Sequence, residues 1–297
     1  MSGALKEVRT RIKSVQSTQQ ITKAMKMVSA AKLRRAQDAV TQMRPYASKL
    51  KEILENVSST LEGSAGGAFS KQRAEKNVLL IVITSNRGLC GAFNANVIKT
   101  ANRLIKDDFK ASKVSVFCIG KKGADYFRKA NINVLDGENA ASLNSIFDKL
   151  KFDHVAPIAE RIMKSFENGE FDKVVMIYNQ FKNAAVQVLT TENYLPVQKP
   201  KLDTTVKKGK KTDYIYEPNK ETIVENLIPK SLKTQLYKAL LDSLASEHGA
   251  RMTAMHKATD NAGTLIKDLK LMYNKARQAA ITNEILEIVG GAEALEG

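Results

Sequence analysis

Several features common in compact enzymes are scarce or missing in this sequence. It contains no tryptophan, and aromatic residues make up only 6% of its 297 residues. The two cysteines, Cys90 and Cys118, form no C-x-x-C pair, which argues against a disulfide scaffold and favours a reducing, cytosolic setting. The longest apolar run, Val78 to Ile83, is much too short to cross a bilayer as a helix. These absences suit a protein built on long helices.

Motifs of catalysis and nucleotide binding are also missing. There is no G-x-x-x-x-G-K-[ST] and no G-x-G-x-x-G, since Gly88 and Gly91 supply only G-x-x-G. That turn is best interpreted as a tight turn before a helix, with a vestigial phosphate cradle as the alternative. The histidines are too scattered to share a metal ion, being His154, His248 and His256. We therefore expect no catalytic residue, no bound cofactor and no metal site.

Positive charge is the main compositional excess. The 47 Lys and Arg residues exceed the 31 Asp and Glu residues, giving a net charge of +16. Such a field favours acidic partners, which include nucleic acid, an anionic membrane surface or an acidic protein face. No stacking aromatics lie between the basic residues, and no helix-turn-helix, zinc-finger or RNA-binding signature is present. A basic coiled-coil protein that binds nucleic acid is therefore only the alternative function.

Long helices are predicted at both ends. From Lys230 to Val289 no proline occurs, and apolar or small residues alternate in steps of three and four, as in a coiled-coil seam. This predicted seam consists of Met255, Ala258, Ala262, Leu265, Leu269, Met272, Ala276, Ala279 and Leu286. Residues 1–60 show the same spacing, with a stutter through Gln19 and Thr22 that predicts looser pairing near residues 21–28. Pro45 predicts a kink or a local break.

The middle of the chain alternates between strand and helix patterns. Strands are predicted at residues 77–84, 113–119 and 173–178, and helices at 92–108, 121–130, 142–150 and 155–168. This order predicts a Rossmann-like, doubly wound and mainly parallel sheet. Added edge strands are expected at residues 184–193 and 212–217.

The predicted fold class is therefore α/β, with a long antiparallel coiled coil formed by the terminal helices around the inserted domain. Pro218 and Pro229 are expected to bracket a short helix, with Pro229 in the first turn of the long one. The predicted parts are a coiled-coil helix at 1–62, an α/β domain at 76–218 and a second coiled-coil helix at 219–297.

The helical ends carry a recognisable signature. The pattern Ile281-Thr282-x-Glu284-x-x-Glu287-x-x-x-Gly291-Ala292-x-Ala294 resembles that of the gamma subunit of F-type, proton-transporting ATP synthase. Further blocks resemble the same family in its order and spacing, at residues 21–28, 86–91, 250–252, 259–262 and 273–278. The blocks cover both terminal helices and the first strand-turn-helix, whereas the rest of the inserted domain matches in pattern more than in residues.

The resemblance implies a rotor shaft. Its coiled coil would lie inside a ring of alpha and beta subunits, and its α/β body would stand on the membrane c-ring beside epsilon. Rotation of the c-ring would pass through the chain to the three catalytic beta subunits, while the chain itself would be non-catalytic. The absence of a leader-like N-terminus and of a plastid-type cysteine insertion favours a bacterial protein, peripheral on the cytoplasmic face of the plasma (inner) membrane.

The resemblance also assigns contact residues. Arg277 and Gln278 match family residues that hydrogen-bond a beta-subunit loop, with Thr282 and Glu284 nearby. Met25 and Arg251 match positions where the shaft meets a beta segment that couples rotation to catalysis. The plainer alternative is that all six merely decorate a coiled coil. An apolar tip, expected to turn inside an apolar sleeve, is formed by Ile285, Leu286, Ile288 and Val289.

Overall fold

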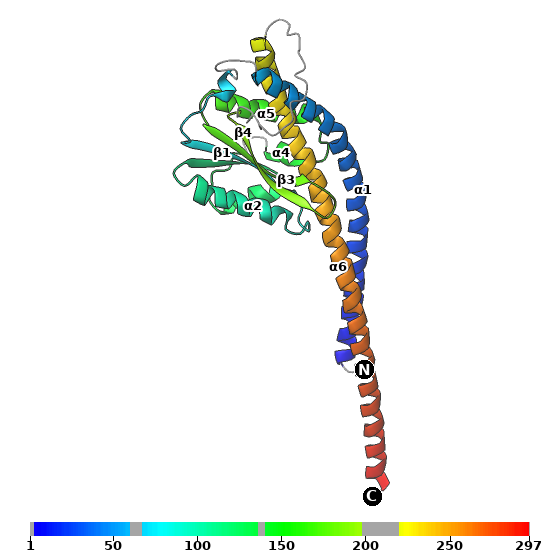
Figure 1. Cartoon of the computed structure of the whole chain (residues 1–297). Coiled ribbons are helices and arrows are strands. Elements are labelled where there is room, and N and C mark those ends of the chain that lie inside the picture. Colours follow the sequence, from blue (N-terminus) through cyan, green and yellow to red (C-terminus); the bar gives the residue numbers. More distant parts are fainter. Residues whose placement is uncertain (1–2, 60–66, 136–139, 198–219, 297) are drawn as a thin grey trace. The chain divides into compact units, whose positions relative to one another are not determined.

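The computed structural model describes residues 3–59, 67–135, 140–197 and 220–296 (Figure 1). The chain divides into two compact units, which are residues 1–30 with 251–297, and residues 31–250. Two long helices, α1 (Gly3–Ser59) and α6 (Lys220–Glu296), contribute to both units. The limits of these units therefore fall inside helices, and the predicted division at residues 62, 76 and 218 stays a prediction.

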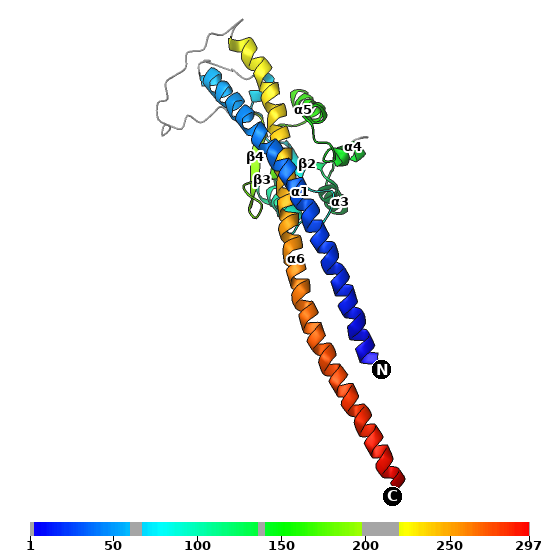
Figure 2. The same ribbon diagram turned by 90° about the vertical axis from the view of Figure 1, so that its right-hand side faces the viewer.

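The first unit is an antiparallel pair of helices. Thr259 donates a hydrogen bond to Thr22 Oγ1 at 2.9 Å, and Arg9 Nη2 donates one to the Tyr273 hydroxyl at 2.7 Å. The residue number in α1 falls between these two contacts as the number in α6 rises, so the helices run in opposite directions. Figures 1 and 2 show α1 and α6 side by side from two directions. The predicted antiparallel coiled coil is confirmed.

The seam of this pair differs from the predicted one at alternate positions. Met255, Ala262 and Leu269 are buried as expected, but Leu265 is 39% exposed and Met272 is 60% exposed. Buried or half-buried side chains instead occur one residue later, at Ile266 and Tyr273. A three-four spacing fits two stripes that share every second position, and the position of α1 selects the stripe through Ile266.

The predicted stutter in α1 is wrong. The covered stripe keeps its three-four steps through Gln19 and Thr22 to Ser29, which is 3% exposed, whereas Val28 is 57% exposed. Polar residues occupy seam positions here, so the seam changes from apolar to polar while the three-four repeat continues unshifted. The repeat is not shifted, so it gives no reason to expect looser pairing near residues 21–28.

The second unit contains a four-stranded sheet in the order β2-β1-β3-β4. Strands β1 (Asn77–Ile83), β2 (Lys113–Ile119) and β3 (Lys173–Phe181) are parallel, and β4 (Gln187–Leu195) is antiparallel to β3. β1 lies between two neighbours and is buried along almost its whole length, as expected of an apolar strand covered on both faces. The doubly wound α/β architecture is confirmed.

Helices cover both faces of the sheet (Figure 1). One face packs on α2 and α3 through Val97, Ala101 and Phe127, and the other packs on α5 and α6 through Phe166 and Leu236. The shorter helical elements are η1 (Gly67–Ser70), α2 (Phe93–Arg103), η2 (Leu104–Asp108), α3 (Lys121–Lys129), α4 (Ala140–Ser145) and α5 (Phe152–Glu167).

Proline predictions need correction. α6 is continuous from Lys220 with Pro229 inside it, so the separate short helix was wrong. Ile228 and Leu232 are buried at 4% and 3% exposure on either side of this proline, and their packing holds the helix together although proline removes one backbone hydrogen bond. α1 is continuous through Pro45, so the predicted local break is wrong, and the alternative of a kink stays a prediction.

Other boundaries shift modestly. The helix expected over residues 92–108 ends as the π-helical turn η2, where Phe109 N donates to Leu104 O at 2.8 Å. The helix expected over 142–150 is α4, which ends at Ser145. The edge strand expected over 184–193 is β4, and the one expected over 212–217 lies outside the described residues.

Candidate partner-binding site

The last described turns of α6 expose apolar side chains on every side. All residues from Ile281 to Ala292 are exposed, and the exposed fractions are 55% at Ile285, 62% at Leu286, 72% at Ile288 and 55% at Val289. Figures 1 and 2 both show this red segment running beyond the end of α1. A surface helix normally exposes its polar face, so these turns are suited to enclosure by another protein.

The predicted polar contact residues lie immediately before and within this segment. Arg277, Gln278, Thr282 and Glu284 are all exposed, and Thr282 Oγ1 donates to Gln278 O at 3.0 Å within the helix. Gln278, Thr282, Ile285 and Val289 follow steps of four, three and four residues, which places them on one helix face. The structure therefore brings the polar group and the apolar tip together as one continuous surface, which we name the tip surface.

The other two predicted contact residues differ in exposure. Met25 is half-buried and Arg251 is buried at 8% exposure. Little of the Arg251 side chain is thus available to a partner in this conformation, whereas Met25 presents part of its surface. Their contact with a beta subunit remains a prediction.

A second apolar stripe beside Met25 was missed in the sequence. Ile21 and Val28 are 60% and 57% exposed, and with Met25 they follow a four-three spacing along α1. Thr22 and Ser29 occupy the seam in this part of α1. The exposure of Ile21 and Val28 could have been inferred from the sequence only by assigning polar residues to the seam.

The glycine turn after β1 uses its polar groups internally. Thr84 Oγ1 accepts a hydrogen bond from Gly123 N at 2.9 Å, and Asn94 Oδ1 accepts one from Ser85 N at 2.9 Å. Gly120 has a φ of 111°, and a Cβ there would lie 2.0 Å from Thr84 O. These bonds join the end of β1 to α3 and α2, and the turn itself has positive φ angles of 62° at Leu89 and 59° at Gly91. Both features favour the tight-turn interpretation over a phosphate cradle.

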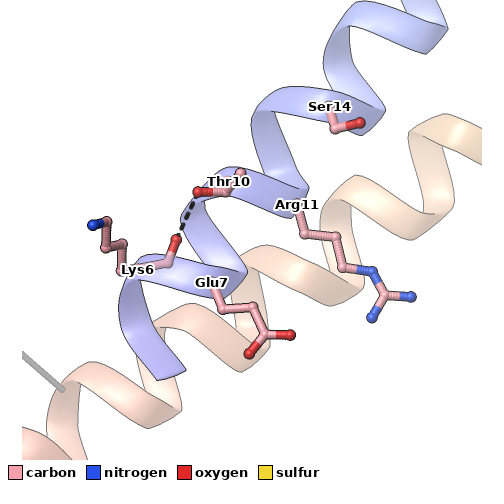
Figure 3. A pocket seen from close by; sticks show the side chains of 5 residues that line it. All are labelled: Lys6, Glu7, Thr10, Arg11 and Ser14. Carbon is pink, nitrogen blue, oxygen red and sulfur yellow. Dashed lines mark hydrogen bonds between the residues drawn. The ribbon is translucent and has the colours of Figure 1, made fainter. Parts of the chain in front are cut away.

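A shallow hollow is lined by five residues on the outside of α1, where Thr10 donates to Lys6 O at 2.9 Å (Figure 3). Among the described residues, no group of three or more His, Cys, Asp and Glu side chains could hold a metal ion. None of the described helices has the length and apolar character needed to span a bilayer.

A paired helical element, an α/β body and an exposed apolar helix end together define a subunit that works by binding other proteins. A family model described as ATP synthase matches residues 4–295. Curated relatives include the ATP synthase gamma chains of Flavobacterium psychrophilum, at 63% identity, and Christiangramia forsetii, at 55% identity, each covering 99% of both chains. The chain therefore belongs to this family, among its gamma chains.

Solved structures give the same fold. The chain resembles a central stalk/c-ring structure of the Tetrahymena thermophila mitochondrial ATP synthase, with 27% identity, a TM-score of 0.56 and coverage of 80% of this chain and 99% of that one. It also resembles a rotor structure of the Euglena gracilis mitochondrial ATP synthase, with 21% identity, a TM-score of 0.65 and coverage of 94% and 99%. The resemblance found in the sequence motifs is confirmed.

Proposed function

We propose that the chain is the central rotor shaft of a bacterial F-type ATP synthase. It passes rotation of the membrane c-ring to the three catalytic beta subunits during proton-driven ATP synthesis, and works in reverse during ATP hydrolysis. The observation that carries this proposal is the tip surface, whose apolar turns are exposed from Ile281 onward. The comparisons give no support to the alternative of a basic nucleic-acid-binding protein.

The subunit itself is non-catalytic in this proposal. Its partners are the alpha and beta subunits of the head, the epsilon subunit and the c-ring, and its association with the membrane is peripheral, through the c-ring. In a bacterium this places it at the cytoplasmic face of the plasma (inner) membrane. The proposal keeps the division predicted from the sequence, with a coiled-coil helix at 1–62, an α/β domain at 76–218 and a second coiled-coil helix at 219–297.

The helical pair suits this work because its surface has no threefold symmetry. One helix pair turning inside a ring of three beta subunits presents a different face to each of them at any moment. Arg277, Gln278, Thr282 and Glu284 supply directional polar contacts to a beta subunit, and Met25 and Arg251 supply contacts further along the pair. A beta subunit whose one conformation binds the face presented to it better is thereby shifted toward that conformation.

The apolar tip acts as a bearing. Ile285, Leu286, Ile288 and Val289 form dispersion contacts, which depend little on direction. Rotation within an apolar sleeve therefore breaks few hydrogen bonds and meets a low barrier.

Reconstitution tests both parts of the proposal. Alpha and beta subunits are assembled with and without the chain, and ATP turnover is measured; we expect the chain to raise turnover markedly. The double variant Ile288→Lys/Val289→Lys should keep the unfolding temperature of the free chain but lose coupled turnover, by which we mean the ATP turnover gained when the chain is added. The loss is expected because two charges are buried in the sleeve.

The matched control adds the same two charges to exposed positions of the body, as Ala111→Lys/Ala130→Lys. This control should retain coupled turnover. Full coupled turnover by the tip variant would contradict the bearing, and salt-sensitive DNA binding without any effect on the head would favour the alternative function.

A further inference from the structure

A junction in the second unit joins both long helices to the end of β3. We name it the hairpin junction, and it consists of Arg44 from α1, of Asp242, Ser246 and Gly249 from α6, and of residues 179–184 at the β3–β4 turn. Figures 1 and 2 show the β3–β4 hairpin beside α6. All of these residues lie within residues 31–250, one compact unit.

Main-chain atoms of the hairpin are held by both helices. Arg44 Nη2 donates to Phe181 O at 2.9 Å, and Ser246 Oγ donates to Asn179 O at 3.0 Å. A Cβ on Gly249 would lie 2.9 Å from Ala184 O, so the backbone of α6 comes close to the turn itself. Contacts to backbone atoms fix position along and around the helix, because they depend on direction as well as distance.

An ion pair links the two helices at the same place. Arg44 Nη2, the atom bound to Phe181 O, lies 3.6 Å from Asp242 Oδ1. The Asp242 side chain is 1% exposed, and neither of its carboxylate oxygens has a hydrogen-bond partner among the described residues. The Arg44 side chain is 49% exposed, so the pair combines a buried anion with a partly solvated cation.

The burial of Asp242 is weak evidence for a stabilising role. Burial raises the pKa of its carboxyl group, and the charges of Arg44 and Lys238 oppose this only in part. A buried carboxylate without hydrogen bonds costs free energy, and neutral replacements of buried ionic groups are often tolerated or stabilising. An asparagine of the same size would avoid the cost of burying a charge.

We propose that Arg44 and Asp242 form a torque-bearing clamp, in which a charge pair and main-chain hydrogen bonds resist twisting of the α/β body about the helices. This inference rests on the proposed rotor function and adds the residues through which the body would grip the shaft. The apolar core between α6 and the sheet resists separation, and the clamp adds contacts that depend on direction. Displacing Arg44 leaves a buried carboxylate and the Phe181 carbonyl without this partner. Resistance therefore rises steeply with small rotations.

The test measures torsional stiffness in the reconstituted complex of alpha, beta and full-length chain. A bead is attached to the body through a cysteine introduced at exposed Ala111, since both native cysteines are buried. In complexes stalled during hydrolysis, Asp242→Asn should increase the variance of the bead angle several-fold, while the unfolding temperature of the free chain is unchanged or higher. Arg44→Gln should increase the variance similarly, and Arg44→Lys should recover part of the stiffness.

The control is Lys49→Gln, which removes the exposed ion pair with Glu52 on α1 and should leave the variance at the parent value. Parent-like variance in both Asp242→Asn and Arg44→Gln overturns the clamp. A lowered unfolding temperature in both also overturns it, because the pair would then be a fold-stabilising contact. If beads on the parent chain never rotate during hydrolysis, the proposed rotor function fails instead, so the two failures are distinguishable.

Discussion

The two ends of α6 contrast sharply in burial although both are rich in apolar residues. Near its start, Leu232, Leu236 and Leu240 are 3%, 0% and 0% exposed. Near its other end, Ile285 and Ile288 are 55% and 72% exposed. One helix thus contains a core segment and an uncovered segment.

This difference shows that apolar composition does not decide what covers a helix. The first segment packs on the chain's own sheet, together with Met176 and Phe166. No described sheet or helix covers the second segment. Its apolar area is therefore left for another protein to enclose, which would be favourable. Substitutions should therefore act on the stability of the free chain at one end and on assembly at the other.

Truncating a leucine at the buried end has the largest expected effect. Leu236→Ala should lower the free energy of unfolding by about 2–5 kcal/mol, because it removes buried methyl groups and leaves a cavity. Ile288→Ala is the matched control, and should change it by less than about 0.5 kcal/mol. Guanidinium unfolding of the isolated full-length chain measures both, and equal losses would remove the distinction between the two ends.

Truncation within the helical pair tests the corrected seam. Leu269 is 3% exposed and Leu265 is 39% exposed, so Leu269→Ala should cost about 2 kcal/mol or more and Leu265→Ala less than about 1 kcal/mol. Loss of helical circular dichroism on heating reports the change. A larger effect at Leu265 would restore the seam predicted from the sequence.

Much of the architecture follows from local sequence patterns. β2 has the predicted limits, and β1 differs by one residue, because each is a short run of apolar, β-branched residues followed by a polar or glycine turn. The two long helices follow from their three-four spacing, and the motifs near residues 281–294 indicate the family. These signals are local, so one chain is enough to recognise them.

The seam register and the site details depend on contacts that no local pattern specifies. Both stripes of α6 satisfy the same spacing, and only the position of α1 separates Leu265 from Ile266. Pro229 is retained inside α6 by burial on the sheet, which overrides the local tendency to break. Arg44 and Asp242 lie far apart in sequence and form their ion pair where both long helices meet the end of β3.

Alkaline pH should destabilise the body, where burial raises the pKa of the Cys118 thiol from 9.0 to about 12. The folded chain keeps this proton while the unfolded chain loses it, so stability is fully present below pH 9 and falls as pH rises between 9 and about 12. The expected slope is about 1.4 kcal/mol per pH unit. Cys118→Ala should reduce the slope of the unfolding free energy between pH 9.5 and about 11 by that amount. An unchanged slope would contradict the assignment of this pH dependence to Cys118. Burial raises the pKa of Tyr178 and Tyr194 as well, so some slope remains.

The smallest expected effect concerns the polar layer of the helical pair. Thr259→Val removes the bond to Thr22 and should cost about 1 kcal/mol, because Thr22 keeps a buried oxygen with one partner fewer. The double variant Thr22→Val/Thr259→Val should recover most of that loss, since replacing both partners of a buried hydrogen bond by apolar groups is nearly neutral. Thr264→Val is the control, because the exposed Thr264 donates its hydrogen bond within its own helix, to Asp260 O at 3.3 Å. Thermal unfolding of the parent and the three variants measures these stability differences. A Thr259→Val chain more stable than the parent would mean that the polar layer lowers stability. Polar seam residues that specify register have this effect in coiled coils.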